Sequence, residues 1–259
     1  MNPLEPHRKF SLDSFVESCL EDSDSIPSRR SVSDSEKTLF APLHYEPKYP
    51  YPLLVWLHGG ETSDNRELLQ IMPKVSLSNY VSVAPRGLTI ESDHEATFGW
   101  PQTLEGIAES EQRTFECIVA ARKRFHIDRR KVFIGGFGEG GTMAVRIAWR
   151  NPHLFCGAVS ICGPLPEKHQ PFAGFVHARR IPIFLAVGRD SEYYSPMKAG
   201  ENLKLLHTAG VNVTLRQYPC GQELSPYMLA DLNEWIMATM SEEGASCDPL
   251  DAPGSYRGD

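Results

Sequence analysis

The sequence predicts an α/β fold, with a mainly parallel sheet covered by helices on both faces. Short apolar runs alternate with longer segments whose apolar residues recur at helical spacing. Apolar runs bounded by turn residues are typical of strands buried on both faces of a parallel sheet. In residues 131–147 a strand leads through a glycine-rich turn directly into a helix, and this unit is the centre of the pattern. The 259 residues, 41% of them hydrophobic, suffice for one large domain.

The individual elements follow from this alternation. Apolar runs predict strands at 39–45, 53–57, 80–84, 132–134, 158–161, 183–187 and 211–218, the first of them at an edge of the sheet. Helical spacing predicts helices that begin near residues 64, 103, 139, 197 and 226. Asp64 and Glu67 have the spacing of a capping box, and Ser225 with Pro226 has the pattern of an N-cap followed by proline. Residues 88–102 and 163–180 are expected to be loops, the second of which could cover a pocket.

The chain divides into one domain and two tails. Residues 1–38 are rich in serine and aspartate and poor in apolar side chains, so they are predicted to be a disordered tail. The α/β domain is expected to cover residues 39–240, and residues 241–259 are again polar and predicted to be disordered. No internal repeat is visible.

Composition excludes several classes of protein. The net charge of −7 argues against a nucleic-acid-binding protein, which would carry a basic patch. No stretch approaches the roughly 18 apolar residues of a membrane span, and the first residues lack the apolar core of a signal peptide. The six cysteines have neither metal-binding nor disulfide spacing, so a cytoplasmic protein without metal or cofactor is expected.

The glycine-rich turn at 136–140 has the outline of a nucleophile elbow, G-x-S-x-G, with Gly138 in place of the serine. Gly136, Gly138 and Gly141 also fit the spacing G-x-G-x-x-G of dinucleotide-binding proteins. That motif requires an acidic residue about 20 positions further on, and the next strand ends without one. A glycine-rich turn with only a packing role is the third interpretation.

The order of features along the chain favours the elbow. One strand ends in His58-Gly59-Gly60, a later strand enters the elbow, a third ends at Asp190, and the turn after the last strand has Gln222 where a histidine is expected. Elbow, acid and histidine follow one another in this order in α/β-hydrolases. The chain here resembles the phospholipase/carboxylesterase family, which includes small serine esterases and acyl-protein thioesterases. The resemblance covers about residues 52–240, and its carriers are PLLVWLHGG, VAPRG, the Trp100 loop, RRKVFIGGFGEGGTMAVRIA, GRD and YPCGQELSPYMLADLNEWI.

The resemblance implies an α/β-hydrolase fold and a set of site residues. The family typically reads GFSQGG at the elbow and GHE in the last turn, so the triad positions are Gly138, Asp190 and Gln222, and only Asp190 matches. The implied oxyanion donors are the backbone N–H groups of Gly60 and Glu139. The remaining implied residues around the site are His58, Gly59, Trp100 and Cys220.

Serine-hydrolase chemistry needs a nucleophile and a base, and neither Gly138 nor Gln222 can supply one. Asp190 is therefore expected to cap its turn or to bond to Gln222, and the Glu139 carboxylate to interact with the start of its helix. The first functional hypothesis is a family member that no longer hydrolyses esters and binds a small acyl or ester-like ligand or a protein partner. Two alternatives stay open: an ester or thioester hydrolase with a substituted nucleophile such as Cys220, and a nucleotide-binding oxidoreductase.

Overall fold

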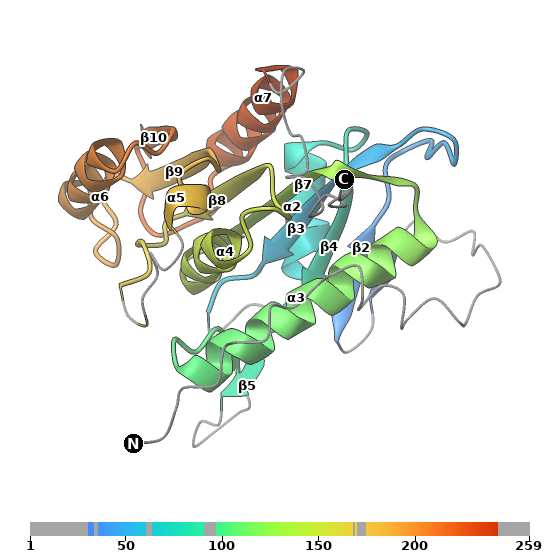
Figure 1. Cartoon of the computed structure of the whole chain (residues 1–259), viewed down its shortest axis with the longest axis horizontal. Helices are drawn as coiled ribbons and strands as arrows, with labels where there is room; N and C mark the ends of the chain where they lie inside the picture. The colour runs from blue at the N-terminus through green and yellow to red at the C-terminus, as the bar shows by residue number, and fades with distance from the viewer. Residues whose placement is uncertain are drawn as a thin grey trace, which may run out of the picture.

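The computed structural model describes residues 31–33, 36–60, 64–90, 97–167, 169 and 175–242. An eight-stranded sheet runs through this part of the chain in the order β1-β2-β4-β3-β7-β8-β9-β10 (Figure 1). Its strands are β1 (Ser31–Ser33), β2 (Lys37–Phe40), β3 (Tyr51–Leu57), β4 (Val81–Pro85), β7 (Ile127–Phe137), β8 (Gly157–Ile161), β9 (Ile183–Gly188) and β10 (Val213–Tyr218).

The sheet is mainly parallel, as the sequence predicted. From β4 to β10 every neighbouring pair of strands is parallel, whereas β1 pairs with β2, and β2 with β4, in the antiparallel sense. In β3, β4, β8 and β9 every residue is buried, which is why these strands read as continuous apolar runs. This confirms the predicted fold class.

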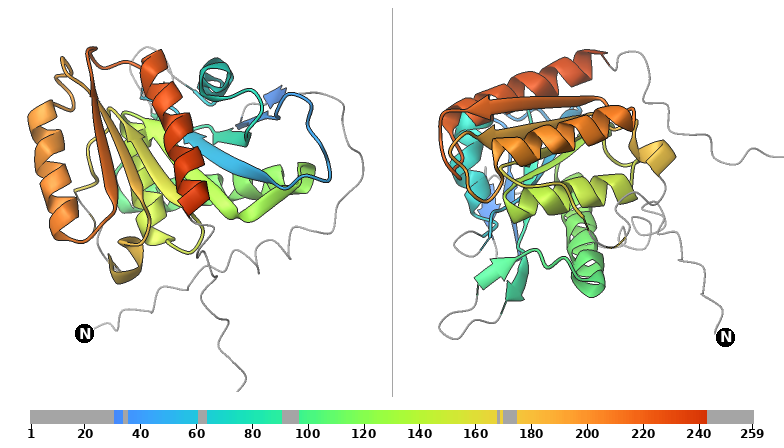
Figure 2. Two further views of the ribbon diagram at one scale, coloured as in Figure 1. Left: turned by 90° about the horizontal axis from the view of Figure 1, so that it is seen from above. Right: turned by 90° about the vertical axis from the view of Figure 1, so that its left-hand side faces the viewer.

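Helices cover both faces of the sheet (Figure 2). Side chains of α3 and α4 belong to the hydrophobic cluster on one face, together with Leu206 of α6. Side chains of α2 and α7 belong to the cluster on the other face. The helices are α2 (Glu67–Val75), α3 (Leu104–Arg124), α4 (Glu139–Arg150), the short α5 (Phe175–Ala178), α6 (Pro196–Thr208) and α7 (Pro226–Glu242).

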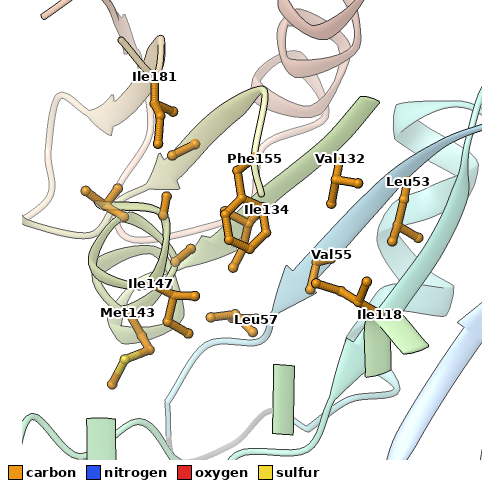
Figure 3. Packing of buried hydrophobic residues seen from close by; sticks show 14 of the residues in the cluster. Leu53, Val55, Leu57, Ile118, Val132, Ile134, Met143, Ile147, Phe155 and Ile181 are labelled. Carbon is orange, nitrogen blue, oxygen red and sulfur yellow. The ribbon is translucent and has the colours of Figure 1, made fainter. Parts of the chain in front are cut away.

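The core lies deepest where α4 packs on the middle of the sheet. Met143 and Ile147 of α4 lie close to Leu57 and Ile134, which come from the adjacent central strands β3 and β7 (Figure 3). All four side chains are fully excluded from solvent. The beginning of α4 is therefore held firmly against the carboxyl end of β3.

The structure corrects several predicted boundaries. β1 and the start of β2 fall inside the range 1–38 that was predicted to be a disordered tail, and β2 is not an edge strand because β1 pairs beyond it. α7 extends to Glu242, inside the range predicted as the second tail. Residues 1–30 and 243–259, which the prediction of disorder also covered, lie outside the described residues.

The predicted loop at 88–102 contains regular structure. Two short strands, β5 (Leu88–Ile90) and β6 (Thr97–Gly99), pair in the antiparallel sense and form a separate ribbon. The ribbon follows β4 and precedes α3, so it lies at the edge where the parallel strands end. Within the residues that the structure describes, no helix combines the length and apolar character needed to cross a membrane.

Candidate functional site

The turn between β7 and α4 has the backbone shape of a nucleophile elbow. Gly138 has φ 53° and ψ −122°, a combination that residues with a side chain rarely adopt. Its N–H donates to the Ile161 carbonyl of β8 at 2.8 Å, and its carbonyl accepts the Thr142 N–H at 3.1 Å in the first turn of α4. The turn is thus held from both sides.

Gly140 brings α4 unusually close to the end of β3. A Cβ at Gly140 would lie 2.2 Å from the His58 carbonyl oxygen and 2.3 Å from that of Leu57. No side chain fits there, because real Cβ atoms are essentially never closer than 3.0 Å to such an atom. This contact fixes the loop 58–60 directly beside the elbow.

A buried carboxylate holds the loop that follows β3. The Glu67 side chain, 9% exposed, accepts the Trp56 indole N–H at 2.7 Å and the Gly59 N–H at 3.3 Å. The predicted capping box of Asp64 and Glu67 is therefore wrong. Asp64 accepts the Arg66 N–H instead, at 2.8 Å, while Glu67 faces the core.

His58 is buried and supports the same loop. Its Nε2 accepts the Gly87 N–H at 2.9 Å, so Nδ1 carries the proton and donates to the Gly59 carbonyl at 2.6 Å. Burial lowers the pKa of His58 to about 4. The Trp100 indole N–H donates to the His58 carbonyl at 2.8 Å, and Trp100 is itself only 1% exposed. Trp100 therefore supports the loop through this hydrogen bond and offers no open surface to a ligand.

Gln222 lies directly beside Gly138. A Cβ at Gly138 would be 3.7 Å from the Gln222 Nε2 atom, which is ordinary van der Waals contact. Gln222 Nε2 donates to the Cys162 carbonyl at 2.9 Å, and Oε1 accepts the Ser191 hydroxyl at 2.7 Å. The side chain is solvent-exposed, yet both ends of its amide are hydrogen-bonded.

Asp190 does not take part in this contact. Its carboxylate pairs with Arg189, with Nε and Nη2 at 3.1 and 3.2 Å, and its side chain is 59% exposed. The Arg189 guanidinium lowers the pKa of Asp190 below its usual value. The expected bond from Asp190 to Gln222 is therefore wrong, and only its backbone N–H reaches the neighbouring turn, at the Cys220 carbonyl.

The Glu139 carboxylate lies over the loop 58–60. One of its oxygens would be 3.6 Å from a Cβ at Gly60 and 3.5 Å from a Cβ at Gly99 of the β5–β6 ribbon. Burial and then the Glu139 charge raise the pKa of Tyr193, an exposed residue after β9. A negative charge thus stands next to the backbone of Gly60.

Two cysteines lie at this edge of the sheet. Cys220, partly buried, has a raised pKa because of burial and the nearby carboxylates Glu223 and Asp190. Cys162 is fully buried, and burial raises its pKa to about 11. Both sulfurs are therefore held in the thiol form at neutral pH. In the described part of the chain, no three His, Cys, Asp or Glu side chains gather as a metal site would require.

The sequence reasoning did not predict the roles that three residues have in this region. Ser191, the partner of Gln222, is 5% exposed and directly follows the acid in the sequence GRDS, which was the only local signal for it. Cys162 has φ 54°, and a positive φ at a non-glycine residue carries no sequence signature. Glu67 was recognised as a helix-start residue, but its direction into the core was not.

Comparison with known proteins agrees with this geometry. A model of the family Phospholipase/Carboxylesterase matches residues 46–240. The structure is similar to that of SOBER1 from Arabidopsis thaliana, at 19% identity and a TM-score of 0.64, covering 73% of this chain and 99% of that one. It is also similar to a Bacillus cereus carboxylesterase, at 20% identity and a TM-score of 0.61, covering 78% and 93% of the two chains. Acyl-protein thioesterase 2 from Zea mays matches at 18% identity and a TM-score of 0.59, covering 79% and 98%.

These structural neighbours share the fold, and the family model covers most of the chain. The assignment replaces the dinucleotide-binding alternative that the spacing of Gly136, Gly138 and Gly141 had left open. The chain belongs to the phospholipase/carboxylesterase family of α/β-hydrolases.

Proposed function

We propose that this protein is a non-hydrolytic member of its family, which binds an uncharged ester or acyl compound without cleaving it. One observation carries the proposal: Gly138 stands at the tip of the elbow, and its neighbour Gln222 has both ends of its amide occupied. Glycine offers no nucleophilic atom, and an amide cannot take up a proton near neutral pH. The family's reaction needs both.

Among the residues that the structure describes, no side chain near Gly138 is well suited to replace the missing serine. The hydroxyls of Thr142, Ser160 and Ser191 each donate to an oxygen at 2.7–2.8 Å, namely the Pro164 carbonyl, the Gly163 carbonyl and Gln222 Oε1. The raised pKa values of Cys220 and Cys162 oppose formation of the thiolate that a cysteine nucleophile requires. These contacts favour binding over the alternative of a substituted nucleophile.

His58 is equally unsuited to act as a general base. Its Nε2 accepts a backbone N–H and its Nδ1 donates to a backbone carbonyl, so both ring nitrogens are engaged. A pKa of about 4 leaves it neutral at physiological pH, and it would take up a proton only reluctantly. Its contacts support a role in shaping the loop 58–60.

The charge of Glu139 favours an uncharged ligand. Backbone N–H groups such as those of Gly60 and Glu139 can bind a carbonyl oxygen regardless of the side chains around them. The Glu139 carboxylate beside Gly60 would repel a carboxylate ligand and would destabilise the negatively charged intermediate of ester hydrolysis. A neutral ester carbonyl meets the least repulsion there.

A protein partner is the second candidate, because large apolar side chains are exposed at the same edge. Leu104, Met197 and Tyr227 lie in the first turns of α3, α6 and α7 and are 64, 76 and 74% exposed. Tyr193, which precedes α6, is 54% exposed. Aromatic and methionine side chains are enriched in protein interfaces.

Activity assays test the loss of hydrolysis. Purified protein should not turn over p-nitrophenyl butyrate above the buffer rate, and a fluorophosphonate probe should not label it. A family member that has its catalytic serine and hydrolyses esters serves as the positive control. Labelling at any residue in 131–146, or turnover that Cys220→Ala abolishes, would refute the proposal.

Ligand titrations test the binding. In NMR titrations methyl octanoate should shift the amide signals of Gly60 and Glu139, and octanoate should do so only at higher concentration. Glu139→Gln should reduce this difference by about fivefold, the effect of one unit charge at about 4 Å in water. If neither compound shifts these signals, the site does not bind esters and the partner hypothesis replaces it.

A further inference from the structure

We propose that the protein also binds a phosphate-bearing small molecule, in a basic hollow at the opposite end of the sheet from Gly138. The hollow lies where the chain turns from α3 into β7, beside the residue that precedes β3. Figure 1 shows the course of the chain from α3 into β7. The strand β7 runs for 11 residues between this point and the elbow. At about 3.3 Å per residue this strand separates the two sites by roughly 35 Å.

The hollow has the size of a ligand site. Its volume is about 580 Å³, within the range of roughly 300–1,000 Å³ that is typical of small-molecule pockets. Its wall includes Pro50, Arg122, Phe125, His126, Arg129 and Arg130. Three arginines therefore face one open space, together with a histidine and an aromatic ring.

The local charge is opposite to that of the whole protein. The sequence RKRFHIDRRK, residues 122–131, contains six lysines and arginines and one acid, whereas the chain as a whole has a net charge of −7. Planar guanidinium groups match the geometry of phosphate oxygens and bind them bidentately. This concentration of positive charge makes the hollow a specific place for an anion.

Asp128 is the one acid among the described residues that line the hollow, and it is already engaged. Asp128 accepts the Arg130 N–H at 3.0 Å and lies 3.6 Å from the Arg130 Nε atom and 3.8 Å from Lys131 Nζ. The carbonyl end of α3 adds about half a negative charge. Neither offsets Arg129, whose exposed guanidinium pairs with no carboxylate in the described part of the chain.

The other wall of the hollow is apolar and held in place. The Phe125 ring packs edge-on against Tyr45, with ring centres 5.2 Å apart. The next residue, His126, donates its N–H to the Tyr45 hydroxyl at 2.7 Å and its Nδ1–H to the Pro47 carbonyl at 3.1 Å. Its Nε2 is thereby directed away from these contacts. Arginines beside an apolar wall favour a phosphate monoester with an apolar group over inorganic phosphate.

Calorimetric titration with phenyl phosphate and with inorganic phosphate tests this site. Phenyl phosphate should bind saturably and more tightly than inorganic phosphate. Arg129→Ala with Arg130→Ala should weaken its binding about tenfold or more, because two charge-assisted contacts are lost. The control is Arg179→Ala with Lys204→Ala, which removes the same charge from exposed positions near α5 and on α6 and should leave the affinity within about twofold.

A second measurement uses the wild-type protein. Phenyl phosphate should protect Arg129 and Arg130 from modification by phenylglyoxal, as measured by mass spectrometry. Equal weakening in the control variant would mean a general charge effect and would overturn the proposal. So would the absence of saturable binding and protection, or binding to phosphatidylserine vesicles without any binding of phenyl phosphate. None of these outcomes bears on ester hydrolysis, so the site stands or fails independently of the proposed function.

Discussion

Replacing Gly138 by alanine isolates the strain in the elbow. A Cβ at this position would meet only Gln222 Nε2, at 3.7 Å, so crowding contributes nothing to the effect. The cost comes from holding an alanine at φ 53° and ψ −122°, which is of order 1–3 kcal/mol. Against this, alanine lowers the entropy of the unfolded chain, worth about 0.4–1 kcal/mol. The net effect should be a destabilisation of about 1 kcal/mol or more.

The assay is urea unfolding of the wild type and the variant, monitored by fluorescence. The two free energies of unfolding are compared with the same slope against urea concentration. Gly200 provides the matched control, because it lies exposed inside α6, with no atom within 4 Å of a Cβ and no positive φ. Gly200→Ala should stabilise the protein by about 0.5–1 kcal/mol. The two substitutions thus make the same chemical change with opposite expected signs.

A second control separates strain from position. Gly210 follows α6 with φ 74° and open space around it, so Gly210→Ala should also destabilise. If Gly138→Ala were neutral or stabilising while both controls behaved as expected, residue 138 would have ordinary backbone angles. The interpretation of this turn as a nucleophile elbow with glycine in place of the serine would then be wrong.

Three further predictions concern the site and its support. Gly138→Ser combined with Gln222→His should give only weak hydrolysis of p-nitrophenyl butyrate, and adding Glu139→Gln should raise that rate about fivefold by removing a charge worth about 1 kcal/mol near the developing oxyanion. Trp100→Phe should lower the free energy of unfolding by about 1–3 kcal/mol, measured in urea, because the buried His58 carbonyl loses its donor. Since the pKa of His58 is about 4 when folded and 6.5 when exposed, the unfolded state binds more protons between these values, and stability should fall by up to about 3 kcal/mol as the pH drops from 6.5 to 4.

Each of these has a clear contrary result. An inactive but folded triple variant would mean that the elbow and Gln222 are not aligned for catalysis. A Trp100→Phe protein as stable as the wild type would mean that water replaces the indole N–H. For the pH effect, His58→Gln should flatten the dependence of the urea midpoint on pH. If that variant does not fold, NMR of the wild type provides the test. The ring signals of His58 should show a neutral imidazole down to about pH 5.

The fold was predictable from the sequence because burial leaves a simple pattern. β3 and β8 are buried along their whole length, so they appear in the sequence as short apolar runs bounded by turn residues, which is typical of buried strands. β5 and β6 were missed because each has only three residues, too few for alternation to be visible. β7 begins at Ile127, five residues before the predicted strand, because its first part carries the charged run at 128–131.

The site was predictable only where the backbone itself dictates the residue type. The tight contact of Gly140 demands glycine, the positive φ of Gly138 favours it, and glycines are visible in a sequence. The partner of Gln222 was not predictable, because Ser191 is 31 positions away and either it or Asp190 could have faced the turn. Which of two adjacent side chains points inward depends on the path of the loop after β9.

The amide of Gln222 joins three separate turns. Its oxygen holds the turn after β9 through Ser191, its nitrogen holds the turn after β8 through Cys162, and its own backbone belongs to the turn after β10. A catalytic histidine at this position would have to exchange partners during each reaction cycle, which requires freedom to move. In the structure the glutamine instead crosslinks chain segments that are distant in sequence. Substitutions at residue 222 should therefore first increase the rate of backbone amide hydrogen exchange in these three turns.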